Sequence, residues 1–273
     1  MPGWTLVASQ ADIERAPAER VFGTPHPRLG GHVLSYTSHD FPDMPPMTWR
    51  VAPLGVITMV LDFEVPLRRE AGTDTTFPVS PVNGLRDRPM MIEQSGPSRG
   101  IAVALTPLGA YALFGLPLRE LANTSIGLAD LLGGCLIEQL AETDGWDARF
   151  RLLDEYLKSR IGGGPELARP VEGAWHRLNS SRGLLRISTL ADEIGWTRQH
   201  LNIRFREQIG LPPKTVARIA RLHRAASMMT RPSPLPWSDI AVGCGYTDQS
   251  HLNRDFRALT GCTPSEFVRP LWK

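Results

Sequence analysis

The chain has 273 residues, of which 42% are hydrophobic and 21% charged, and its formal net charge is +2. These values are typical of a soluble globular protein with about two domains. No apolar run approaches the roughly 18 residues needed to cross a membrane, and the N-terminus lacks the basic and apolar segments of a signal peptide. We therefore expect a cytoplasmic protein without a membrane partner.

The charge is unevenly distributed along the chain. Residues 1–170 contain 15 Lys and Arg and 20 Asp and Glu, a net charge of −5, whereas residues 171–273 contain 15 and 8, a net charge of +7. Of the 15 basic residues in the second segment, 13 are arginines, whose guanidinium suits forked contacts with phosphate and guanine. The second segment is therefore expected to meet a polyanion.

The first half of the chain is predicted to be mainly β-structure followed by helices. Short β-like runs between Pro- and Gly-rich breaks are typical of a small β-barrel or sandwich. Thr106 is expected to cap a helix that begins at Pro107. The predicted strands are His32–Ser38, Gly55–Phe63, Thr76–Val79, Met90–Ser95 and Gly100–Leu105, with a hairpin tip at Arg68–Thr75, and further helical segments are Leu128–Leu132, Leu136–Leu140 and Asp147–Ile161.

The run Gly162-Gly163-Gly164-Pro165 ends the last of these helices. Glycine and proline at this density stop a helix and are typical of a connection between domains. The predicted organisation is an N-terminal domain over residues 1–161, a linker over residues 162–169 and a C-terminal domain over residues 170–273.

Nothing in the first half predicts an enzyme. His26, His32 and His39 are six and seven residues apart, unlike the H-x-H pair of a metal-binding β-barrel, and no further histidine precedes His176. Nucleophile, phosphate-binding and dinucleotide-binding motifs are absent from the sequence. The cysteines Cys135, Cys244 and Cys262 are too far apart for a metal-type pair and are expected to be buried. We therefore predict no catalytic residue, no metal and no cofactor.

One helix-turn-helix pattern occurs twice in the last third of the chain. The copy L-A-D-E-I-G-W-T-R-Q-H-L-N-I-R-F-R-E-Q-I-G-L-P-P begins at Leu190, and the copy I-A-V-G-C-G-Y-T-D-Q-S-H-L-N-R-D-F-R-A-L-T-G-C-T-P begins at Ile240. A repeat of this length is an architectural signal. In each copy a glycine (Gly195 or Gly245) is expected to supply the left-handed turn.

Within each copy, short helices and their caps can be assigned. In the first, Ser188 or Thr189 is expected to cap the short helix, and Thr197 the recognition helix. In the second, Thr247 or Asp248 has that role. The inward residues are Leu201 and Phe205, then Leu252, Phe256 and Leu259. A long helix over Pro213–Thr230, with Lys214, Arg218, Arg221 and Arg224 as its exposed charges, is expected to join the copies.

This stretch resembles the DNA-binding domain of AraC/XylS-type transcription regulators, in which two helix-turn-helix units are joined by a linker helix. The motif G-Y-T-D-Q-S-H-L-N-R-D-F-R-A-L-T-G-C-T-P-S-E-F is its most specific part. The segment T-P-L-G-A-Y-A-L-F-G-L-P-L-R-E-L resembles, less specifically, family members with a cupin-like β-barrel before that domain. The implied fold class is α+β: an N-terminal cupin-like β-barrel with a helical section, then an all-α domain with two helix-turn-helix units.

The resemblance also implies the residues that read DNA. The family's base-reading positions fall on Gln199, Asn202 and Ile203 in the first recognition helix, and on Gln249, Ser250, His251 and Arg254 in the second. Arginine often reads guanine at the position of Ile203, so the first unit is expected to specify fewer bases. The outward residues Arg198 and Arg206 complete the candidate set, together with Arg204 as a phosphate contact.

We therefore expect a sequence-specific transcription regulator that binds double-stranded DNA in successive major grooves. The resemblance implies RNA polymerase as a protein partner. The N-terminal domain is expected either to sense a small-molecule effector or to form a homodimer, and the sequence does not separate these roles. Two alternatives stay open: a catalytic or metal-binding barrel, with a metal at His32 or His39, fused to a DNA-binding domain, and an architectural DNA binder without an effector.

Overall fold

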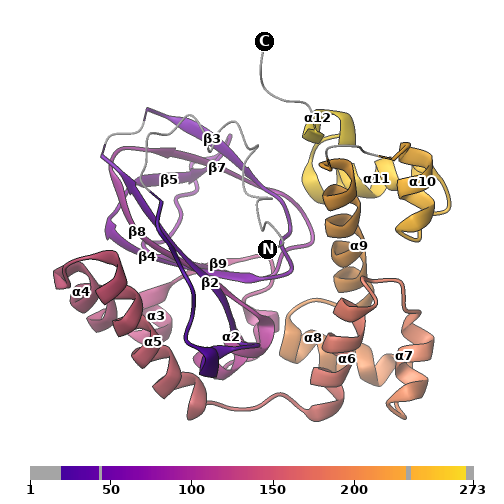
Figure 1. Cartoon of the computed structure of the whole chain (residues 1–273), viewed down its shortest axis with the longest axis horizontal. Coiled ribbons are helices and arrows are strands. Elements are labelled where there is room, and N and C mark those ends of the chain that lie inside the picture. Colours follow the sequence, from indigo (N-terminus) through magenta and orange to yellow (C-terminus); the bar gives the residue numbers. More distant parts are fainter. Residues whose placement is uncertain (1–19, 43–44, 232–234, 269–273) are drawn as a thin grey trace.

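A computed structural model describes residues 20–42, 45–231 and 235–268. Figure 1 shows a β-rich N-terminal region (residues 20–162 as described) beside a helical C-terminal region (residues 169–268 as described). In the described part of the chain, no helix combines the length and apolarity needed to span a bilayer.

The strands of the N-terminal region form two antiparallel sheets. One has six strands in the order β1-β2-β8-β4-β6-β9, and the other has three in the order β3-β7-β5. The predicted α+β class is confirmed, but the sheets are not closed into the barrel that we expected, because each pairs only within itself in the described residues. The strands are β1 (Phe22–Gly23), β2 (Val33–Phe41), β3 (Met47–Val51), β4 (Ile57–Glu64), β5 (Leu67–Glu70), β6 (Pro81–Asn83), β7 (Met90–Ser95), β8 (Ser98–Leu105) and β9 (Ser125–Gly127).

Most predicted strands are present with shifted ends, and Met90–Ser95 has the predicted bounds. The prediction for Thr76–Val79 is wrong, since only Thr76 pairs there, in an isolated bridge with Arg69. The predicted hairpin tip at Arg68–Thr75 begins as strand β5, which pairs with β7. Its charged sequence, L-R-R-E, has low β-propensity, so the strand was not predicted. Pairing with β7 stabilises it.

Helices follow the sheets and then build the C-terminal region. Thr106 caps α2 as predicted, with its side-chain oxygen accepting a hydrogen bond from the Gly109 amide. The helices are α2 (Pro107–Phe114), α3 (Leu128–Leu132), α4 (Cys135–Glu142), α5 (Trp146–Gly162), α6 (Arg169–Ser180), α7 (Ile187–Glu193), α8 (Arg198–Ile209), α9 (Pro213–Met229), α10 (Trp237–Gly243), α11 (Gln249–Thr260) and α12 (Pro264–Val268), with 3-10 turns η1 (Pro27–Leu29) and η2 (Leu118–Glu120).

One face of the six-stranded sheet packs on α5. Tyr36 of β2 stacks on Phe150 with ring centroids 5.6 Å apart, and its hydroxyl donates a hydrogen bond to Asp154 at 2.8 Å. Burial, together with Asp154, raises the pKa of Tyr36 above its usual range. Val103 of β8 is the cross-strand partner of Tyr36, Met59 of β4 is in turn the partner of Val103, and all three residues are fully buried. This face forms the core of the N-terminal region.

A buried ion pair joins the two sheets. Arg68 of β5 donates to both carboxylate oxygens of Asp62 of β4, at 2.7 and 2.8 Å, and its Nε donates to Gln94 at 3.1 Å. Burial alone would raise the pKa of Asp62, but the hydrogen bonds from Arg68 and the nearby His39 lower it below its usual value. Because a forked, buried pair fixes both distance and orientation, it holds the three-stranded sheet over the larger one.

We expect Arg68→Gln to lower the free energy of unfolding by about 3 kcal/mol at pH 7, because it leaves a buried carboxylate without its cation. The lowered pKa of Asp62 means that its ionised form stabilises the fold above the unfolded-state pKa of about 3.9, and that this stability is lost as the pH falls further. Denaturant unfolding at several pH values should therefore show the difference between the proteins shrinking in acid. Arg69→Gln, at the exposed neighbouring position, is the control and should change little.

Candidate nucleic-acid interface

The first helix-turn-helix unit consists of α7, a turn at Gly195 and α8. Gly195 has φ +71°, the left-handed conformation that glycine adopts without strain. Thr197 caps α8 as predicted, accepting from the His200 amide at 3.1 Å, and Leu201 and Phe205 are fully buried. One prediction is wrong: α7 begins at Ile187, so Ser188 and Thr189 lie inside it, and its N-cap, Arg186, makes no side-chain capping hydrogen bond.

The second unit repeats this construction with α10, Gly245 and α11. Gly245 has φ +77°, and Asp248 is the residue that caps α11, accepting from the His251 amide at 2.7 Å. Leu252 and Phe256 are fully buried, like their counterparts in the first unit. The two recognition helices, α8 and α11, therefore present equivalent faces to solvent.

Most of the predicted DNA-reading side chains are exposed on these two faces. Ile203 is 55% exposed, so its apolar side chain faces solvent on α8. Arg204 and His251 are only partly exposed. The exposed residues are Arg198, Gln199, Asn202, Ile203 and Arg206 on α8, and Gln249, Ser250 and Arg254 on α11.

The two partly exposed side chains have structural contacts. Arg204 donates to Glu207 at 2.8 Å on its own helix, so part of its charge is already neutralised. The His251 ring meets the edge of Tyr246 with centroids 5.3 Å apart. The first unit repeats this contact between Trp196 and His200, at 4.4 Å. In both units an aromatic residue of the turn thus orients a histidine of the recognition helix.

A buried polar network holds α11 against α9. Arg218 donates to the nearly buried carboxylate of Asp255, with its Nε at 2.8 Å, and Tyr246 donates to the other oxygen of that carboxylate at 3.3 Å. Burial, and then the charge of Asp255, raises the pKa of Tyr246 above its usual range. The prediction of exposed linker-helix charges therefore holds for Lys214 but is wrong for Arg218, Arg221 and Arg224, which are partly buried. Arg218 instead positions the second recognition helix.

Comparisons with known proteins agree with this geometry. Residues 190–270 match a family model described as a helix-turn-helix domain. The C-terminal region therefore contains a helix-turn-helix domain, and it is similar to the AraC/XylS type that the sequence predicted. Residues 23–127 match a model described only as a domain of unknown function (DUF6597).

The relatives match this chain over different shares of its length. The "F1 operon positive regulatory protein" of Yersinia pestis is 30% identical over 95 residues, which are 34% of this chain and 31% of that protein. This chain thus spans about a third of the curated relatives that it matches. Among solved structures, an AraC-type transcriptional regulator from Chromobacterium violaceum has a TM-score of 0.33 at 21% identity, over 36% of this chain and 88% of that one. ToxT from Vibrio cholerae has a TM-score of 0.42 at 13% identity, over 82% and 97%.

The N-terminal region touches both units of the helix-turn-helix domain. The turn η2 packs on α8, and Arg119 of η2 lies 3.7 Å from Glu207. His223, midway along α9, makes a hydrogen bond of 2.8 Å with the Pro53 carbonyl, and burial lowers its pKa. Beside α11, Gly261 lies so close to Pro89 that a Cβ would come within 3.2 Å of its ring. The N-terminal region therefore contacts the first unit, the linker helix and the end of the second unit.

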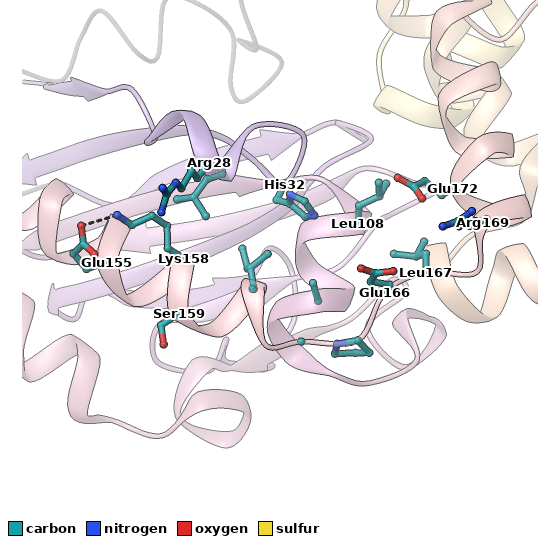
Figure 2. Close-up of a pocket in the computed structure, with 16 residues that line it drawn as sticks. Arg28, His32, Leu108, Glu155, Lys158, Ser159, Glu166, Leu167, Arg169 and Glu172 are labelled. Atoms are coloured by element: carbon teal, nitrogen blue, oxygen red, sulfur yellow. Dashed lines mark hydrogen bonds and ion pairs between the residues drawn. The ribbon is translucent and has the colours of Figure 1, made fainter.

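A groove of about 980 Å³ lies between the N-terminal region and the helix-turn-helix domain. Figure 2 shows Arg28, Lys158 and Glu155 at one end, and Glu166, Arg169 and Glu172 at the other. Its wall includes apolar side chains of α2, α5 and the peptide before α6: Leu108, Ala112, Ile161 and Leu167. The imidazole of His32, which also lines the groove, has a buried Nδ1 without a hydrogen-bond partner. Both regions of the protein thus contribute to one partly apolar, charged concavity.

The histidines considered as metal ligands have separate surroundings. His26 accepts a hydrogen bond from the Arg28 amide, His32 lines the groove, and His39 lies 3.8 Å from Asp62 between the sheets. Within the residues that the structure describes, no three His, Cys, Asp or Glu residues form a group that could hold a metal ion. The predicted burial holds for Cys244 and Cys262 but is wrong for Cys135, which is exposed.

Sequence reasoning missed the residues that position the interface. Asp255 lies three residues after Leu252 and so falls on the inward face of α11, but its pairing with Arg218 depends on the approach of α9. Arg186 and Lys214 were not among the predicted DNA contacts, although both line a second, smaller concavity with the predicted Arg198. The excess of arginine in this segment indicated a basic surface, but it does not indicate which basic side chains lie around one concavity.

We expect Asp255→Ala to lower the free energy of unfolding by about 2 kcal/mol, because it removes charge-assisted hydrogen bonds at a buried site. Tyr246→Phe removes only the longer hydrogen bond and should cost about 1 kcal/mol. Denaturant unfolding followed by tryptophan fluorescence would measure both values. An equal cost for the two variants would contradict the assignment of Arg218 as the main partner of Asp255.

Proposed function

We propose that this protein is a sequence-specific, DNA-binding transcription regulator that acts in the cytoplasm, and not an enzyme. The observation that carries the proposal is the pair of recognition helices, with exposed polar faces, joined by one continuous helix. The helix α9 has 17 residues, which corresponds to a length of about 25 Å. A continuous helix of this length fixes the separation of the two recognition helices, as simultaneous entry into successive major grooves requires.

In this proposal the two units have different tasks. Arg254 offers a forked donor that suits guanine, and the amides of Gln249, Gln199 and Asn202 each offer one donor and one acceptor that suit adenine. Ile203 is exposed but apolar, so it contacts a thymine methyl group. The first unit then acts partly as an anchor through phosphate contacts of Arg198 and Arg206, and the second unit contributes more of the sequence choice.

We further propose that the N-terminal region regulates this binding. Its contacts with α8, α9 and the end of α11 couple its position to the separation of the two recognition helices. The groove in Figure 2 supports the site of a small-molecule effector, because its walls come from both regions and its volume suits a small ligand. RNA polymerase and a second copy of this chain are the protein partners that a regulator of this type would use.

The DNA-binding proposal predicts that the full chain retains a defined motif from a pool of randomised duplexes. Arg254→Ala should then weaken binding by about 1–3 kcal/mol at a single base position and relax the preference there. Recovery of no motif would refute sequence-specific regulation. A uniform loss across all sequences would mean that Arg254 contacts phosphate instead of a base.

The effector proposal predicts that a metabolite raises the thermal midpoint of the protein and changes its affinity for the selected DNA. Ser159→Trp places a large side chain in the groove from an exposed position on α5. It should abolish the shift without lowering the midpoint of the free protein. Arg151→Trp, at an exposed position of the same helix that does not line the groove, is the control. A shift that survives in the Ser159 variant would place the effector elsewhere.

A further inference from the structure

The smaller concavity lies within the helix-turn-helix domain and is strongly cationic. Its volume is about 350 Å³, and its lining includes Arg186, Arg198, Lys214 and Arg221 but no acidic residue. Among the residues described, none of these four cations takes part in an ion pair. Cations without an acidic partner around one concavity create a positive potential there, and this potential attracts an anion.

The walls of the concavity are held firmly in place. Gly183, in the loop between α6 and α7, has φ +74°, and a Cβ there would lie 2.1 Å from the Ala217 carbonyl oxygen of α9. The loop therefore packs directly on the linker helix. The cations consequently project from a fixed frame made by the loop, the start of α8 and one face of α9.

The concavity lies where the two helix-turn-helix units meet. The guanidinium of Arg221 lies over the ring of Tyr246 in the second unit, 5.4 Å from its centroid. Its Nε is buried and has no hydrogen-bond partner. Leu184 of the lining also reaches the second unit, because a Cβ on Gly245 would come within 2.6 Å of its side chain. A ligand here would touch the connection between the two units.

We propose that this concavity, defined by Arg186, Arg198, Lys214 and Arg221 and here called the phosphate seat, binds a phosphodiester of the DNA backbone between the two recognition-helix sites. The inference rests on the proposed DNA binding and adds the anchoring point between the two units. Guanidinium and ammonium groups are the usual phosphate partners. Arg198 is the first residue of the first recognition helix, so the phosphate seat adjoins that helix. Occupation of the seat fixes the register of both units on one backbone segment.

The test uses the full chain with Arg186→Gln and Lys214→Gln together, because both side chains are exposed and their loss should leave the fold intact. Binding to the selected duplex and to a random duplex is measured over a range of salt concentrations. The slope of log K against log salt is negative, and loss of one phosphate contact should reduce its magnitude by about 0.9. Affinity should fall by the same factor for both duplexes.

Two controls separate the seat from general charge. Arg69→Gln with Arg151→Gln removes the same charge from exposed positions of the N-terminal region and should leave the slope unchanged. Arg186→Lys with Lys214→Arg keeps the charge and should restore most of the affinity. If Arg69→Gln with Arg151→Gln reduces the magnitude of the slope equally, the effect comes from net charge and the phosphate seat is refuted.

Duplexes with a single neutral methylphosphonate locate the contact. One such phosphate, between the two recognition sites, should weaken binding of the wild-type protein but not weaken the Gln variant further. Equal effects on both proteins at every position would overturn the phosphate seat while leaving sequence-specific binding intact. Stabilisation of the wild type by inorganic phosphate, without any methylphosphonate effect, would assign the concavity to free phosphate instead. A wild-type protein that selects no DNA motif would refute the proposed function itself.

Discussion

The packing of both helix-turn-helix units on α9 is the constraint on which the C-terminal domain depends. The helices α7 and α10 have seven residues each, far fewer than an isolated helix needs to be stable in water. They persist because their buried residues join a core to which α9 contributes Val216, Ile219 and Leu222. Each of α6, α8, α10 and α11 packs against α9. The same helix therefore stabilises the units and sets their separation.

Ion pairs divide the arginines of this domain into structural and available ones. Asp255 engages Arg218 between α11 and α9, and Glu207 engages Arg204 within α8, so these two cations are already neutralised. Arg198, Arg206 and Arg254 have no acidic partner among the residues described. Part of the positive charge that remains free thus lies on the recognition helices and at the proposed phosphate seat. The excess of arginine serves two purposes, which the charge count alone does not distinguish.

The N-terminal region has its own internal constraint and a shared border with the DNA-binding domain. The Asp62–Arg68 pair holds two sheets together without closing them into a barrel. The region then contacts the other domain at Glu207, His223 and Gly261, which belong to or adjoin three different helices. Because these contacts span both units, a shift of the region would act on both units at once. This is the physical basis for the regulatory role that we propose.

The sequence by itself determined the elements with local signals. Thr106 and Thr197 cap their helices, and Gly195 and Gly245 make the turns, because cap and turn preferences act over three or four residues. The repeat likewise predicted Leu201, Phe205, Leu252 and Phe256 as core residues. Tertiary structure decided which polar residues stay free. The pairing of Asp255 with Arg218, the pairing of the charged strand β5 and the open sheets depend on contacts between segments far apart in sequence. The same holds for the placement of Arg186 and Lys214 around one concavity. Such contacts carry no local pattern, because the energy that fixes them comes from the partner segment.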